Sequence, residues 1–179
     1  MTIETRQPTI DALLDQWRAP LGGDFTAYRN HVYRVFNLAA RMAAARGDTL
    51  EKIAVAAAFH DIGIWLAGTF DYLQPSVDHA RTYLSGAGRE TWRPEIEAMI
   101  QQHHKVTPWQ GASRPLVESF RRADWLDVCL FALPTRLPRR WLSDLLTAFP
   151  RMGFHLMLCR MSARWTLHHP MRPLPMFKW

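Results

Sequence analysis

The chain has 179 residues and a formal charge of +6, with 48% apolar and 21% charged residues, a composition typical of one folded domain rather than a disordered chain. Its two cysteines, Cys129 and Cys159, lack a CxxC spacing, which argues against a disulfide framework and a cysteine-based zinc site. The polar N-terminal segment is not a signal peptide, and no apolar stretch is long enough for a membrane span, so we expect a cytoplasmic protein.

Apolar residues recur at helical spacing along nearly the whole chain, and most of the predicted helices have start or stop signals. Asp24 is placed to cap the first helix, a capping-box sequence DTLE begins the second, and Gly86 ends the third. In chain order, we expect helices over residues 24–46, 48–60, 76–85, 91 through at least 100, 113–131, 138–149 and 154–167. No alternating run of β-branched residues occurs, so the sequence predicts an all-α domain of about six to nine helices, followed by an extended tail over 170–175.

Histidine and aspartate residues fall on these predicted helices at intervals of a helix plus a loop. His60 and Asp61 end a very apolar segment, AVAAAFHD, in which an inward carboxylate must be paired or bound to metal. The other ligand-type residues are His31, His79, His103 with His104, and Asp124. A lone histidine of this kind is usually a core residue, but the set favours one metal ligand from each helix at the centre of a bundle. One aspartate with two oxygens can bridge two cations.

These residues, in this order, resemble the HD-domain superfamily of metal-dependent phosphohydrolases. HVYRVFNLA is similar to the first helix of that family, AAAFHDIG to its name-giving motif, DHARTYL to the helix of its third ligand, and FRRADWLD to its closing helix. The resemblance covers roughly residues 28–127. It implies one domain over 1–179, with an HD-domain helical bundle over about 24–132, accessory helices over about 138–169 and a tail over 170–179.

The six-residue version of the motif implies two divalent or transition-metal ions per chain, most suitably iron or manganese. The resemblance assigns one ion to His31, His60, Asp61 and Asp124, and the other to Asp61, His79 and His103. Asp61 then bridges the two ions and is the central catalytic residue. His104 stays open as a further ligand, because a paired HH binds metal in the cyclic-dinucleotide branch, whereas other branches use only the first histidine.

One departure from the family concerns a positive charge. Many HD hydrolases have lysine directly after HD-x-G, where this chain has Ile64. Arg121, one helical turn before Asp124, is the best-placed substitute as an anion clamp, and Lys105 is the second candidate. Arg122 should point elsewhere, and an ordinary ion pair is the alternative interpretation of Arg121.

The resemblance implies a phosphohydrolase that acts on a small anionic substrate, either a phosphate ester or a nucleotide. A mixed-valent diiron oxygenase acting on a small polar or phosphonate-like substrate uses the same six ligands, and EAMIQQHHKVTPW is similar to a helix of inositol oxygenase. A non-catalytic ligand-binding domain is the third alternative. The basic second half contains no nucleic-acid motif, so no specific nucleic-acid partner is expected. The amphipathic C-terminal helices could pack on the core, cover the cleft, lie on a membrane surface or form a homodimer face.

Overall fold

The computed structural model describes residues 2–177, and within that range the regular structure is helical, without a β-strand. Met1, Lys178 and Trp179, which include the last two residues of the predicted tail, lie outside the described residues. The elements are α1 (Pro8–Gln16), α2 (Arg18–Leu21), η1 (Gly22–Asp24), α3 (Phe25–Met42), α4 (Gly47–Phe59), α5 (Gly63–Leu66), α6 (Leu73–Gly86), η2 (Glu90–Trp92), α7 (Arg93–Gln102), α8 (Arg114–Val128), α9 (Arg139–Ala148) and α10 (Phe154–His168). The all-α prediction is confirmed.

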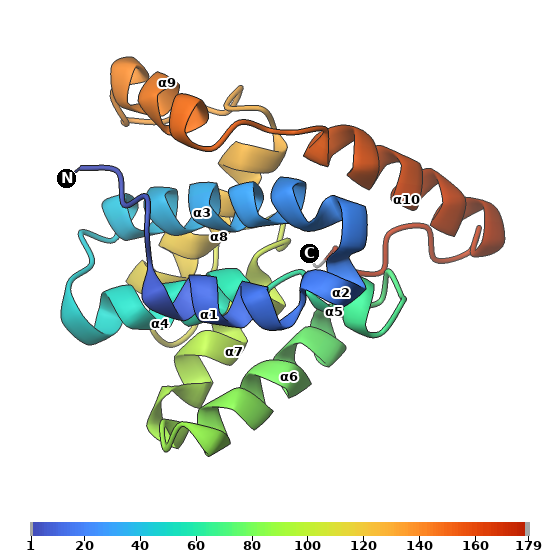
Figure 1. Ribbon diagram of the computed structural model, residues 1–179, viewed down its shortest axis with the longest axis horizontal. Helices are drawn as coiled ribbons and strands as arrows, with labels where there is room; N and C mark the ends of the chain where they lie inside the picture. The colour runs from blue at the N-terminus through green and yellow to red at the C-terminus, as the bar shows by residue number, and fades with distance from the viewer. Residues whose placement is uncertain (1, 178–179) are drawn as a thin grey trace.

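Helix α3 lies at the centre of the molecule, with α4 and α8 packed against it (Figure 1). Helix α1 covers α4 from one side, and α6 and α7 pack against α4 from another. The second half of α4, from Ile53 to Phe59, is buried throughout, as expected for a helix that is apolar on all sides. Its alanines let the neighbouring helices approach closely, so the C-terminal ends of α4 and α7 can meet beside α3 and α8.

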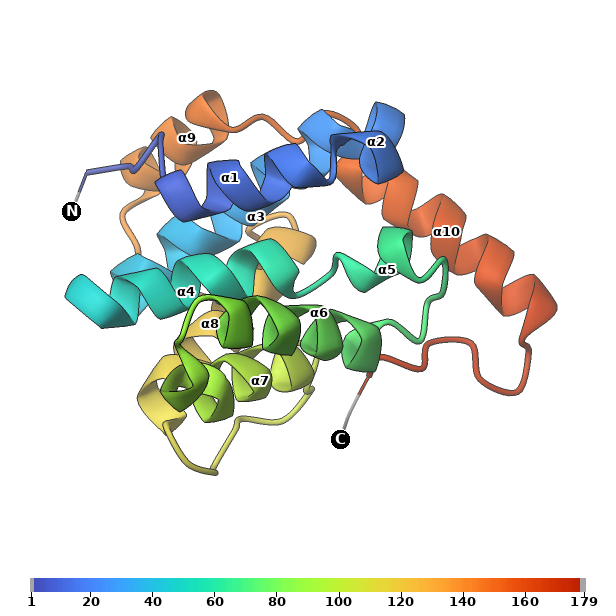
Figure 2. The same cartoon turned by 60° about the horizontal axis from the view of Figure 1, so that its bottom comes forward.

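The C-terminal helices are attached to this bundle along one side of α9 and at the start of α10. Trp141 and Leu145 of α9 are buried, and Phe154 at the start of α10 is fully buried. The rest of α10 extends away from the bundle, and the tail then turns back toward α5 and α6 (Figure 2). There Met176 packs with Ile64 in a small apolar cluster separate from the main core. Within the described part of the chain, none of these helices has the length and apolar character of a bilayer span.

Several helix boundaries differ from the prediction for local reasons. Helix α3 ends at Met42 because Ala44 adopts a positive φ of 48°, and Gly47 begins α4 instead of ending α3. The side chain of Asp24 does not cap α3, since its carboxylate accepts a hydrogen bond from the indole of Trp65. Helices α1, α2 and α5 were not predicted, and the tail over 170–175 forms turns rather than an extended segment.

Candidate metal centre

Two histidines end helices in the same way and point into the space between them. His60 follows α4 and His103 follows α7. The Nδ1 of His60 donates to the carbonyl of Ala57 (2.8 Å), and the Nδ1 of His103 donates to the carbonyl of Ile100 (2.6 Å). Carbonyls in the last turn of a helix lack partners within the helix, so they are free to accept these bonds. Each ring is therefore fixed with its proton on Nδ1 and a lone pair on Nε2.

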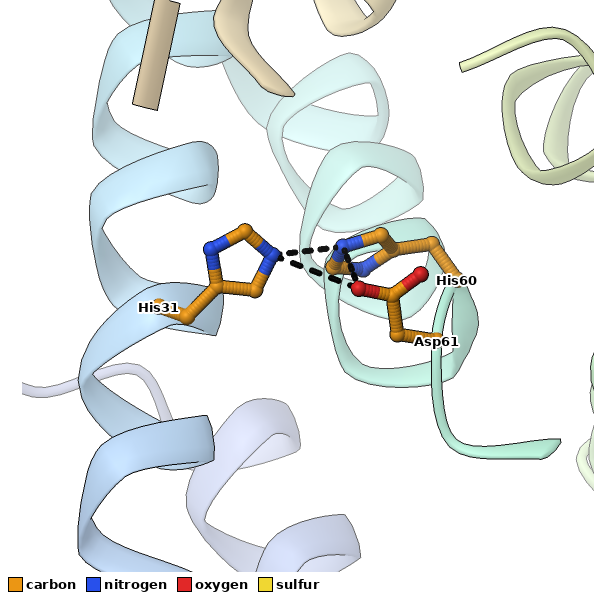
Figure 3. Close-up of side chains that lie close together, drawn as sticks. All are labelled: His31, His60 and Asp61. Atoms are coloured by element: carbon orange, nitrogen blue, oxygen red, sulfur yellow. Dashed lines mark hydrogen bonds and ion pairs between the residues drawn. The ribbon is translucent and has the colours of Figure 1, made fainter. Parts of the chain in front are cut away.

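His31 of α3 brings a third ring to this space. Its Nδ1 donates to Asp127 (2.7 Å), and Phe154 stacks on the ring with centroids 4.1 Å apart. Its Nε2 lies 2.9 Å from the Nε2 of His60. Figure 3 shows these two nitrogens pointing toward each other beside Asp61. Because both Nδ1 atoms hold protons, two neutral rings would turn lone pairs toward each other at this distance. Such a contact requires either an extra proton or a metal ion near the two nitrogens.

The pKa of His31 reflects the same arrangement. Burial lowers this pKa, but the hydrogen bonds to Asp127 and Asp61, together with nearby carboxylate charges, outweigh burial and raise it to about 9. In the absence of metal the ring is therefore protonated at neutral pH. A bound cation would take the place of this proton.

Asp61 lies between two groups of ligand-type atoms. Its Oδ2 is 3.3 Å from the Nε2 of His60 and 3.5 Å from that of His31, while its Oδ1 is 3.3 Å from the Nε2 of His103. Burial raises the pKa of Asp61, but the electrostatic effect of the neighbouring histidines, that of His60 first, holds it well below its usual range. Two groups share this carboxylate: His31, His60 and Asp61, and Asp61, His103 and His104. In each group the ligand atoms lie within 4.8 Å of one another.

Asp124 of α8 closes the site from the opposite side. Its Oδ1 lies 3.6 Å from the Nε2 of His31, and its Oδ2 lies 3.5 Å from the Nδ1 of His104. Both of its oxygens are buried without a hydrogen-bond partner, as are the Oδ1 of Asp61 and the Nε2 of His103. Buried polar atoms are rarely left unpaired, and these four accept rather than donate hydrogen bonds. A concentration of unpaired buried acceptors fits a metal ion.

A buried ion pair supports the site from behind, and it was not predicted from the sequence. Arg34 donates from Nε to the Oδ1 of Asp127 (2.6 Å) and from Nη2 to its Oδ2 (2.9 Å). Both side chains are 0% exposed. Burial raises the pKa of Asp127, but the hydrogen bond from His31 and the charge of Arg34 hold it well below its usual range. The available signal was spacing, because Arg34 lies one turn after His31 and Asp127 one turn after Asp124.

The structure brings His104 to the centre and adds Tyr72 beside it. Helix α7 ends at Gln102, so His103 and His104 lie in a turn. Neighbouring residues on a helix point about 100° apart, but these two lie outside the helix, and the ligand atoms of both rings lie within 4.8 Å of that of Asp61. The Nε2 of His104 is 2.6 Å from the hydroxyl of Tyr72. No motif pointed to Tyr72, which lies just before α6.

His79 is not part of either group. Helix α6 turns Ser76, Val77 and Ala80 toward the core and leaves His79 exposed on its outer side. The second set of ligand atoms comes from the turn after α7 instead, through His103 and His104. The assignment of His79 to the second ion therefore has no geometric support.

Arg121 forms an ion pair rather than facing the metal-ligand groups. Its Nε and Nη2 donate to both oxygens of Glu118 (2.8 and 2.7 Å), and its Nη1 donates to the carbonyl of Lys105 (2.8 Å). The indole of Trp125 donates to the same carbonyl. Arg121 therefore stabilises the turn that follows His104, in agreement with the ion-pair interpretation. Because Glu118 already binds its guanidinium, Arg121 is not available to bind a substrate anion.

A cavity of about 510 Å³ opens onto the centre at Asp61 and His104. We call it the apolar cavity; its walls include Ile64, Phe70, Leu158, Met176 and Phe177. Neither of the predicted cations, Arg121 and Lys105, lines it. Ile64, in the position where many HD hydrolases have lysine, is 3% exposed and forms part of its wall.

A family model for the HD domain matches residues 28–129, which is more than half of the chain. The match begins within α3 and ends directly after α8, so it includes both metal-ligand groups, Tyr72 and the Arg34–Asp127 pair. No curated protein and no solved structure matches the chain.

Proposed function

The chain belongs to the HD-domain family, and on this premise we propose that it is a metal-dependent phosphohydrolase acting on a small phosphate ester or nucleotide. The observation that carries the proposal is the sharing of Asp61 by two groups of buried ligand atoms. His31, His60 and Asp61 would hold one ion, and Asp61, His103 and His104 a second, with Asp124 facing both groups. Nitrogen and carboxylate ligands of this kind suit iron or manganese.

Metal ions held in this way would lower the pKa of a bound water and neutralise charge on the phosphoryl oxygens. The residues of the chain keep the donor atoms in position for this chemistry. The carbonyls of Ala57 and Ile100 hold His60 and His103 in the required tautomer, and Asp127 does the same for His31. Asp61 stays ionised and presents one oxygen to each group.

Tyr72 is the hydrogen-bond donor that we assign in place of the missing lysine. Burial, and then the charge of Asp61, raise the pKa of Tyr72 well above its usual value, so the phenol keeps its proton at neutral pH. With the Nδ1 of His104 directed at the metal group, its Nε2 carries the ring proton and donates it to the Tyr72 oxygen. The phenolic O–H is then available to donate to an ester oxygen of the substrate.

The experiment is phosphate release under argon by protein reconstituted with manganese or ferrous iron. A panel of phosphomonoesters and nucleotides would be compared among the parent, Asp61→Asn, Tyr72→Phe and His79→Ala. We expect Asp61→Asn to be inactive, Tyr72→Phe to lose roughly a hundredfold in kcat, the range for removing one oriented donor, and His79→Ala to match the parent. Absence of phosphate release from every ester by the metal-loaded parent would refute the proposal.

A mixed-valent diiron oxygenase is the second candidate, and one observation favours it. No Lys or Arg occurs among the described residues that line the apolar cavity, so the usual cationic contact for a phosphate is missing. This candidate predicts two irons per chain, a mixed-valent electron paramagnetic signal and substrate-dependent oxygen consumption. Phosphate release under argon with manganese would decide against it.

A further inference from the structure

The apolar cavity carries information about the substrate of the proposed phosphohydrolase, because it is the space that opens onto Asp61 and His104. Five parts of the chain form its walls: the segment over 61–72, the turn after α7 with His104, the end of α8, one side of α10 and the tail over 174–177. Its volume of about 510 Å³ is within the range of sites that enclose most of a small organic ligand. Asp61 and His104 belong to the lining, so a ligand would place its reacting group beside them and its body against the remaining walls.

The walls of this cavity are almost entirely apolar. Six of the side chains are Ile64, Phe70, Leu158, Leu174, Met176 and Phe177. Met176 is only 6% exposed although it comes from the tail, and it packs with Ile64 and Phe70. The ring of Phe177 lies 5.4 Å from that of His104, which brings the apolar wall directly to the metal-ligand groups. An apolar ligand body that contacts these surfaces is removed from water, which makes its binding free energy more favourable.

The small number of charged residues in the cavity also favours an apolar ligand. No Lys or Arg occurs among the described residues that line it, and Asp61 is the one carboxylate there. Tyr72 and Ser162 bring uncharged hydroxyl groups. Bound metal ions would therefore be the main positive charge there, enough for one phosphate. The further phosphates of a nucleotide, or the hydroxyls of a sugar, would be buried with few partners.

We propose that this site takes a phosphate monoester whose organic part is an uncharged, apolar chain or ring, rather than a nucleotide or a sugar phosphate. This inference rests on the proposed phosphohydrolase function for its reacting group, and on the walls of the apolar cavity for the rest of the substrate. Ile64, Leu158, Met176 and Phe177 are then residues that determine specificity.

The test measures binding as well as activity. Calorimetry on the manganese-loaded protein under argon would compare methyl-, butyl-, hexyl- and octylphosphonate with adenosine monophosphate. We expect affinity to rise about threefold for each added methylene until the cavity is filled, and adenosine monophosphate to bind more weakly than octylphosphonate. An affinity that does not change with chain length, or tighter binding of adenosine monophosphate, would overturn the inference.

A pair of variants on α10 tests whether this cavity is the place of binding. Leu158 lines it, whereas Leu156 on the same helix is 56% exposed and does not. Leu158→Ala should weaken binding of octylphosphonate roughly ten- to thirtyfold, the loss expected for two or three carbons of contact, and leave binding of methylphosphonate unchanged. Leu156→Ala is the matched control and should bind both like the parent. Equal effects of the two substitutions would mean that the octyl group of the ligand binds outside the cavity, which would contradict the proposal.

Phosphate release from octyl phosphate, glycerol phosphate and adenosine monophosphate separates this inference from the proposed function. Binding that depends on chain length without any phosphate release would refute the phosphohydrolase and support the apolar ligand. Equal release from all three esters would support the phosphohydrolase and refute the inference about its substrate.

Discussion

Replacing Asp127 with asparagine tests whether the buried ion pair behind the metal centre stabilises the fold and also orients the ring of His31. Arg34 and Asp127 are joined by two hydrogen bonds of 2.6 and 2.9 Å, and both side chains are 0% exposed. Asparagine keeps the shape of the side chain but removes its charge, so the guanidinium of Arg34 stays buried without a counter-charge. Removing one partner of a buried pair costs about 3–5 kcal/mol, and we expect Asp127→Asn to fall at the lower end because the amide oxygen still accepts.

The same substitution should weaken metal binding. Asp127 accepts the Nδ1 proton of His31 at 2.7 Å and thereby directs the Nε2 lone pair into the site. Loss of a partner that orients a ligand typically costs 10- to 100-fold in metal affinity. Urea unfolding in the presence of a chelator would measure the stability change, and competition with a chelating dye would measure the metal affinity.

Two controls separate the two effects. Asp15→Asn breaks a pair with Arg18 of similar length, 2.9 Å, but with side chains 60% and 63% exposed, so its effect on unfolding should be far smaller. The double variant Arg34→Met/Asp127→Leu removes both buried charges and should recover much of the stability, while metal affinity stays low because His31 has lost its acceptor. The reasoning is refuted if Asp127→Asn is no more destabilising than Asp15→Asn.

Three further outcomes follow from the geometry. Elemental analysis should show that His104→Ala loses one metal ion per chain and that His79→Ala loses none; the reverse result would restore the assignment from sequence. Arg121→Ala should lower the free energy of unfolding by about 1–3 kcal/mol through its lost hydrogen bonds, measured by urea unfolding, with metal content unchanged and Arg122→Ala near the parent. Because the pKa of His31 is raised to about 9, its contribution to the stability of the chelated protein is complete below about pH 6.5 and lost as the pH rises through 9. Urea midpoints against pH should show this decline.

Much of the helical architecture could be predicted because apolar spacing reports directly on buried helix faces. The central and C-terminal helices were expected within a few residues of their observed bounds, apart from α3 and α8, which end three or four residues early. Those errors come from backbone conformations that spacing does not reveal, such as the positive φ of Ala44, Leu130 and Phe131. Helices α2 and α5, of four residues each, are too short for a periodic pattern to show.

The ligand-type residues were recognisable from their order, but their final positions depend on details of helix ends. Helix α6 begins at Leu73, and its packing, rather than its sequence, decides that His79 faces solvent. The directions of His103 and His104 could not be predicted from helical spacing, because α7 ends at Gln102 and both residues lie in the turn that follows. The bond between Tyr72 and His104 joins segments 32 residues apart, and no local pattern predicts such a contact.

The central claim is that Asp61 is shared by two metal-ligand groups. Its most direct test is the number of metal ions bound per chain, by elemental analysis after reconstitution with manganese and removal of free metal, in the parent and in Asp61→Asn. We predict two ions per chain in the parent and a loss of both in Asp61→Asn, because each group loses its shared carboxylate. One ion per chain in the parent, or an Asp61→Asn variant that keeps one or both of its ions, would contradict a shared dinuclear centre.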